Sequence, residues 1–93
     1  MPNTNYKLCK KTIGEDTWLI HYRRWSKTTI KITCDLLRPN RKFWQSKFLW
    51  SDWTFCTAEE VNLLEDFADA IIYNYYHQKE VKEKFDNFFE NTD

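Results

Sequence analysis

The chain has 93 residues, and its 14 basic and 14 acidic side chains give a formal net charge of zero. That length suits a single domain spanning residues 1–93, and one glycine and two prolines leave no flexible linker. No apolar run approaches the ~20 residues of a membrane-spanning helix, and the amino-terminal residues lack the apolar stretch of a secretory signal. We therefore expect a cytoplasmic protein.

Charge is divided unequally along the chain. Residues 1–49 carry eleven Lys or Arg against three Asp or Glu, whereas residues 50–93 carry three Lys against eleven Asp or Glu. Such a difference between halves is typical of proteins that bind nucleic acid or another charged partner. The halves can also neutralise each other, within one chain or across a dimer. The pattern separates a basic region, residues 1–55, from an acidic helical region, residues 57–90.

The three cysteines carry no metal or redox motif. Cys9, Cys34 and Cys56 are widely spaced, and neither His21 nor His77 is near a cysteine in the sequence. This spacing favours reduced, half-buried thiols over a disulfide framework or a zinc site. Cys56 precedes an expected helix N-terminus, where a thiolate is stabilised, but nothing in the sequence brings a histidine to it as a base. We expect no catalysis, no metal and no cofactor.

The amino-terminal half alternates between apolar and polar side chains, as strands do. Residues 6–12 predict an edge strand protected by lysines, and Gly14 predicts the turn that follows. Residues 17–24 and 28–36 predict a hairpin, because each has one apolar and one polar row.

Pairing the two apolar rows defines the expected register of this hairpin. A three-residue loop, residues 25–27, would then join the strands. The expected opposite pairs are Tyr22–Ile30, Ile20–Ile32 and Trp18–Cys34, with Trp25 at the tip and His21, Arg23, Thr29, Lys31 and Thr33 on the outer face.

The next segment is less regular. Pro39 and Asn40 predict a turn over residues 38–41, and residues 42–50 predict a further strand. Both rows of that strand carry aromatic residues, so the sequence leaves open which row faces the core. Residues 51–52 predict another turn before a short strand at residues 53–55.

A helix is predicted to begin at Ala58. Thr57 and Glu60 have the spacing of a capping box, in which two side chains satisfy the first free amides of a helix. Apolar residues then recur at helical spacing through residues 61–75.

The end of this helix is open on the sequence alone, because neither glycine nor proline follows. The helix either continues to Phe89 or breaks near residues 77–78. A continuous helix would be ~48 Å long, so its last turns are expected to overhang, bend back or pack on a partner. The expected fold class is α+β: a small antiparallel sheet of roughly three to five strands, followed by a long C-terminal helix packed on one face.

A basic and aromatic set of residues indicates nucleic-acid binding. Lysine and arginine neutralise phosphates, exposed aromatic rings stack on bases, and a sheet covered on one face leaves its other face free. The first hypothesis is a non-enzymatic protein that binds DNA or RNA. Its candidate binding residues are Arg23, Arg24, Trp25, Lys27, Lys31, Arg38, Arg41, Lys42 and Trp44.

The alternative is a small protein-binding inhibitor or adaptor, of the anti-CRISPR-like kind that phages and mobile elements direct against host nucleic-acid-processing or defence enzymes. Acidic residues along the helix would then mimic phosphate charge, although a solvated helix face has the same composition. No membrane partner is expected. A homodimer through the C-terminal helix is also possible, because that region is rich in rings: Tyr73, Tyr75, Tyr76, Phe85, Phe88 and Phe89.

Residues 53–71, WTFCTAEEVNLLEDFADAI, are similar to the passage from sheet to helix in three-stranded DNA-binding domains of the integrase-arm type. The order of elements also resembles the single-strand-binding coactivator fold, which has four strands and then a helix. Both resemblances imply a nucleic-acid-binding sheet. A capping box is a general helix start, so neither assigns a role to a single residue.

Overall fold

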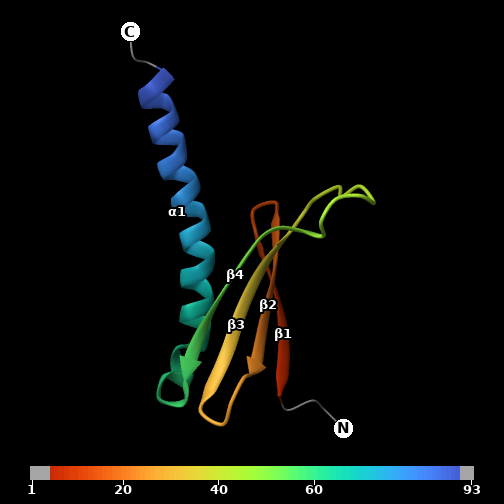
Figure 1. Cartoon of the computed structure of the whole chain (residues 1–93), viewed down its shortest axis with the longest axis vertical. Coiled ribbons are helices and arrows are strands. Elements are labelled where there is room, and N and C mark those ends of the chain that lie inside the picture. The colour runs from red at the N-terminus through yellow and green to blue at the C-terminus, as the bar shows by residue number, and fades with distance from the viewer. Residues whose placement is uncertain (1–4, 91–93) are drawn as a thin grey trace.

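The computed structural model describes residues 5–90, which form one antiparallel sheet and one long helix (Figure 1). A short 3₁₀ helix, η1 (Ala58–Leu63), leads into α1 (Leu64–Glu90). This is the α+β arrangement that the sequence predicts. The strands are β1 (Tyr6–Ile13), β2 (Asp16–Arg24), β3 (Thr29–Leu37) and β4 (Phe48–Thr57).

The strands lie side by side in chain order, each antiparallel to the next. β1 is therefore an edge strand, as predicted, and its lysines disfavour the addition of a further strand. Gly14 makes the tight turn into β2 with φ of +59°, a backbone conformation that glycine adopts at no steric cost.

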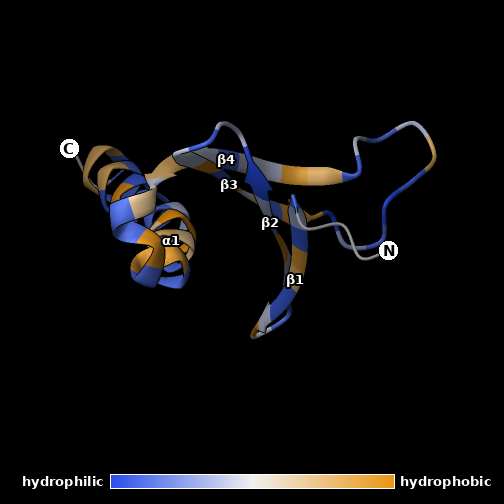
Figure 2. Cartoon of the chain, turned by 90° about the horizontal axis from the view of Figure 1, so that it is seen from below, coloured by the Kyte–Doolittle hydropathy of each residue, from blue (hydrophilic) through white to orange (hydrophobic). Residues whose placement is uncertain are grey.

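One face of the sheet is packed and the other is open. α1 lies across β3 and β4 on one side only, as Figure 2 shows. Alternation along the strands turns every second side chain toward α1, which leaves the opposite row in contact with solvent. The buried apolar core consists of Trp18, Ile20, Ile32, Cys34, Leu36, Cys56, Ala68, Ile71 and Ile72.

The predicted faces of the β2–β3 hairpin are confirmed, but its predicted register is wrong by two residues. An even shift returns every side chain to the same face, so the apolar pattern fits both registers equally well. The observed pairs are Tyr22–Ile32, Ile20–Cys34 and Trp18–Leu36.

The turn explains the shift. Arg24 pairs with Ile30, and the amides of Trp25 and Ser26 both donate to the carbonyl of Thr29, at 2.9 and 3.1 Å. The expected three-residue loop favours glycine at its last position, where this chain has Lys27. The wider turn avoids that requirement.

The expected strand at residues 42–50 and the expected turn at Ser51 and Asp52 are both wrong. Residues 38–47 form a loop, and β4 runs through both polar residues without a break. Ser51 fits within the strand because its hydroxyl donates to the carboxylate of Asp35 on β3. Trp50 packs against the core, which settles the row that faces α1.

The capping box forms where it was predicted. The amide and the hydroxyl of Thr57 both donate to one carboxylate oxygen of Glu60, at 3.2 and 2.7 Å. The first six residues after the cap are 3₁₀ rather than α-helical, and α1 then runs unbroken to Glu90.

The second half of α1 overhangs the sheet, one of the three outcomes expected from its length (Figure 1). The last side chains of α1 that pack against the core are Tyr75 and Tyr76. Within residues 5–90 no helix is both long enough and apolar enough to cross a membrane.

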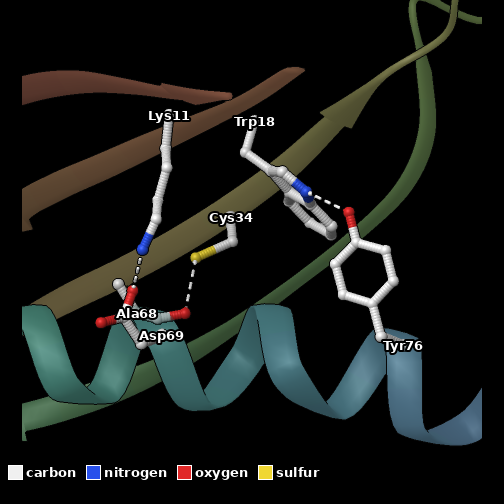
Figure 3. A network of polar contacts seen from close by, with 6 residues as sticks. All are labelled: Lys11, Trp18, Cys34, Ala68, Asp69 and Tyr76. Carbon is white, nitrogen blue, oxygen red and sulfur yellow. Dashed lines mark hydrogen bonds and ion pairs between the residues drawn. The ribbon is translucent and has the colours of Figure 1, made fainter. Parts of the chain in front are cut away.

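Polar contacts fasten α1 to the sheet from three strands (Figure 3). Lys11 of β1 forms an ion pair with Asp69 at 2.6 Å, and the Trp18 indole of β2 donates to the Tyr76 hydroxyl at 3.2 Å. The Cys34 thiol of β3 lies 3.7 Å from the carbonyl oxygen of Ala68. These contacts set the position of the helix along the apolar face.

Burial of Cys34 makes the protein sensitive to alkali. Burial, and then the negative charge of Asp35, raise the pKa of this thiol from 9.0 to about 12. The unfolded chain therefore releases this proton at a lower pH than the folded chain does. The contribution to stability is complete below pH 9 and is lost as the pH rises from 9 toward 12. Burial also raises the pKa of Tyr22 to about 12, which adds to the effect in the same pH range.

We expect the free energy of unfolding, measured by urea denaturation, to fall between pH 9 and pH 11. Cys34→Ala is the informative variant: it is less stable at neutral pH, because it leaves a void, but its stability declines less steeply with pH. Equal slopes for the two proteins would contradict the assignment to Cys34.

Candidate nucleic-acid interface

The open face of the sheet carries an aromatic cluster centred on a lysine. Lys31 of β3 places its Nζ over two indole rings, 5.0 Å from the centroid of Trp25 and 4.6 Å from that of Trp53. Phe55 completes the group, with its centroid 5.7 Å from Trp25 and 5.1 Å from Trp53. We call these four residues the Lys31 cluster.

Strand pairing explains why the cluster forms. Lys31 is directly opposite Phe55, and the neighbouring pair on the same face is Thr33 with Trp53. Trp25 reaches the group from the β2–β3 turn. The three rings keep 41–58% of their surface exposed, which is high for such large apolar side chains.

A second cation–aromatic pair lies beside the cluster. Arg23 of β2 is opposite Lys31, and its guanidinium carbon is 5.3 Å from the centroid of the Tyr6 ring on β1. Two positive charges and four rings thus share one face that no other element of residues 5–90 covers. Cations over ring faces are held electrostatically, and the rings stay close to the charges that would contact phosphates.

A polar chain crosses the same face near the cluster. The Tyr6 hydroxyl is 2.5 Å from Nδ1 of His21, whose Nε2 is 2.9 Å from one oxygen of the Asp35 carboxylate. The Ser51 hydroxyl donates to the other oxygen. Asp35 is buried, so the bond from Ser51 replaces water that its carboxylate loses, whereas the buried Nε2 of His21 lies close to that carboxylate without a hydrogen bond.

These polar contacts do not form a nucleophilic triad. Ser51 and His21 contact different oxygens of Asp35, so the imidazole has no path to the serine hydroxyl as a base. The arrangement links one residue from each of the four strands on the open face.

The structure brings together only part of the predicted binding set. Arg23, Trp25 and Lys31 meet on the open face, and Lys27 lies next to them in the β2–β3 turn. Arg24 belongs to the row that faces the helix side, although it is exposed at the end of β2.

The other four predicted residues lie elsewhere. Arg38, Arg41, Lys42 and Trp44 belong to the loop of residues 38–47, which projects from the opposite end of the sheet (Figure 1). Both arginines hold the loop together: Arg38 donates to the carbonyl of Ser46 at 2.9 Å, and Arg41 donates to that of Gln45 at 3.3 Å. The Nζ of Lys42 lies 5.2 Å from the centroid of the Trp44 ring.

Sequence reasoning missed Trp53, Phe55 and Tyr6 as members of the site. The alternation of Trp53 and Phe55 was visible, but the expected turn at residues 51–52 separated them from the sheet. Reading residues 48–57 as one strand would have placed both rings on the open face.

Charge separates across the sheet. The open face, the β2–β3 turn and the loop of residues 38–47 are basic. Acidic residues collect on η1 and on the first turns of α1, on the helix side. Within residues 5–90, Lys11–Asp69 is the single ion pair that joins a basic side chain to an acidic one without involving a histidine. The basic face is therefore not neutralised by the acidic helix.

Cys56, the cysteine that the sequence places before the helix, lies in an environment that does not activate a thiol. Cys56 is buried on the helix side, where its thiol contacts the carbonyl of Glu60 at 3.3 Å. Burial, and then the carboxylate of Glu60, raise the pKa of Cys56, whereas a reactive thiol needs a lowered pKa. His21 is on the other face, and His77 stacks on Tyr73 of α1.

No group of three potential metal ligands occurs among the described residues 5–90. Comparison of the chain with protein-family models, curated proteins and solved structures finds no match.

Proposed function

We propose that this protein binds nucleic acid on the open face of its sheet. The Lys31 cluster is the observation that carries the proposal. Exposed indole and phenyl rings offer flat surfaces on which bases stack, and Arg23 and Lys31 stand beside them to contact phosphates. The uncovered face extends over all four strands, and Lys27 adds a positive charge in the β2–β3 turn.

Salt dependence is the direct test. Fluorescence anisotropy of labelled single-stranded and duplex oligonucleotides should show binding that weakens with salt, log affinity falling linearly with log salt concentration. The slope is roughly −0.7 per phosphate contact for a single strand and −0.9 for a duplex. We expect Arg23→Ala and Lys31→Ala each to reduce the slope by about one contact.

Lys84→Ala is the matched control, because it removes the same charge from the overhanging part of α1, away from the open face. Its slope should equal that of the unaltered protein. No binding at low salt, or equal losses in all three variants, would refute the proposal.

A second candidate, a small protein-binding inhibitor or adaptor, is favoured by one observation. Phe43 is 90% exposed in the projecting loop, beside the exposed ring of Trp44. An aromatic side chain presented in this way is typical of an anchor that fills a pocket of a partner. Inhibition of a purified phage-defence nuclease that is lost in Phe43→Ala, without nucleic-acid binding, would select this function instead.

A further inference from the structure

The apolar stripe of α1 continues past the point where the helix leaves the sheet. The side chains that pack on the sheet end at Tyr76. Successive residues of an α-helix are rotated by about 100°, so positions 18 apart lie in line. On that spacing Val81, Phe85 and Phe89 share one face, at one edge of the face that packs on the sheet, with Phe85 in line with Phe67 and Phe89 in line with Ile71. We call Val81, Phe85 and Phe89 the distal stripe.

The centre of the packing face becomes polar in the overhang, where it carries Lys79, Glu83 and Asp86. These charges suit water, so the overhang is not built to extend the full contact between α1 and the sheet. The distal stripe keeps only one edge of that face apolar, beyond the last contact with the sheet.

The two phenylalanines of the distal stripe are exposed in this structure, and Val81 is half-buried. Phe85 and Phe89 keep 61% and 72% of their surface accessible, and Phe88 beside them is also exposed. Val81 and Phe85 line a shallow hollow with His77 and Gln78. Large apolar side chains gathered on one face of a helix are typical of an interaction surface.

We propose that two copies of this chain associate through the distal stripes as an antiparallel pair of helices. Phe85 lies midway between Val81 and Phe89, four residues from each. A two-fold axis beside Phe85 therefore places the Val81 side chain of one copy against Phe89 of the other. Such a stripe is complementary to itself, which is the condition for a two-fold interface.

Charge permits this arrangement, and the position of the sheets favours the antiparallel orientation. Residues 77–90 contain three lysines and four acidic residues, so two overhangs do not repel each other strongly. Antiparallel packing places the two sheets at opposite ends of the pair, where they cannot collide.

The available surface is of the size that a small dimer needs. The overhang has 14 residues and a length of about 21 Å. The phenylalanine rings, each of which buries about 150–250 Å² when covered, supply roughly half of the ~800 Å² per partner of a standard interface. Val81 and the aliphatic stems of Gln78, Lys82 and their neighbours supply the remainder.

Sedimentation equilibrium over a range of protein concentrations tests the proposal. The unaltered protein should approach twice the chain mass of 11.5 kDa. Phe85→Glu should raise the dimer dissociation constant by at least about 100-fold, because each copy loses a buried ring and gains a charge at the axis. Its far-ultraviolet circular dichroism should not change, since Phe85 lies beyond the core.

Tyr73→Glu is the matched control. Tyr73 is an aromatic residue of α1 with 69% exposure, but it lies on a different face from the distal stripe. The dissociation constant of this variant should stay within about twofold of the unaltered value. A monomer at all concentrations, or equal dissociation by both variants, would overturn the proposal.

Distance measurements establish the orientation. Spin labels on Asn74→Cys, in a Cys9→Ser background, should lie on the order of 33–35 Å apart in the antiparallel dimer, because residue 74 is exposed and is eleven positions from the axis, outside the overlap of the two helices. A parallel pair would place them about 10 Å apart, and that result would refute the antiparallel arrangement.

Discussion

Replacing Trp18 by alanine is expected to lower the free energy of unfolding by about 3–5 kcal/mol. The indole is fully buried and lies edge-on to three rings, with centroid distances of 5.8 Å to Trp50, 5.5 Å to Tyr75 and 6.2 Å to Tyr76. A domain of this size is typically stable by about 5–15 kcal/mol, so the loss would remove a substantial part of its stability.

The indole also supports a polar contact that alanine cannot replace. Its Nε1 donates to the Tyr76 hydroxyl, which donates in turn to Asp16 at 2.6 Å. Trp18→Phe separates the two contributions, because it keeps a buried ring but removes the donor. We expect this variant to lose about 1–2 kcal/mol.

Guanidinium denaturation followed by circular dichroism measures both changes. Trp50→Phe provides a reference for a partly buried ring at the edge of the same group. A midpoint of Trp18→Ala close to that of the unaltered protein would show that the contacts between α1 and the sheet do not depend on this side chain.

The second large effect concerns binding. Trp25→Ala and Trp53→Ala are each expected to weaken nucleic-acid binding by about 1–3 kcal/mol, which is roughly 5- to 150-fold. The two effects should not be additive, because the ammonium group of Lys31 lies over both rings. Each indole therefore helps to position the lysine that the other indole contacts. A double-mutant cycle measured by anisotropy at fixed salt gives the coupling.

Trp44→Ala is the control for this experiment. Trp44 is also an exposed indole with a lysine over its ring, but it lies in the loop at the other end of the sheet. Its replacement should leave affinity unchanged if the site is the open face alone. A loss as large as that of Trp53→Ala would show that nucleic acid reaches the projecting loop as well.

The faces of the sheet could be predicted from the sequence, whereas the register could not. Trp18, Ile20 and Tyr22 alternate with polar residues, and only one assignment buries the apolar row. Moving β3 by two residues keeps that assignment, so the choice between registers depends on the conformation of the β2–β3 turn. That turn is determined by a few hydrogen bonds around Thr29, which no composition rule describes.

Only part of the candidate site could be predicted from the sequence, for a related reason. Arg23, Trp25 and Lys31 are close in sequence, and hairpin geometry brings them together. Trp53 and Phe55 come from β4, and placing them required Ser51 and Asp52 to be strand residues. Both residue types favour turns locally, but a tertiary contact, the bond from Ser51 to Asp35, overrides that preference here.

The overhang was one of several outcomes that the sequence left open. A helix that starts at a recognisable cap and meets no glycine or proline outgrows a sheet whose strands have eight to ten residues, but a break near residues 77–78 fitted the sequence equally well. The apolar edge of the overhang is also present in the sequence, but it becomes informative only when the last contact with the sheet is known to be Tyr76.

The order of the strands has a consequence for synthesis of the chain on the ribosome. Each strand pairs with the one made just before it, so the sheet consists of hairpins that form within about 1–10 μs. The 27 residues of α1 follow the sheet, and at 5–20 residues per second they take about 1–5 s to add. During those seconds the apolar face around Trp18 has no cover. The nascent sheet is then most exposed to aggregation and to chaperones, and docking of α1 ends that interval.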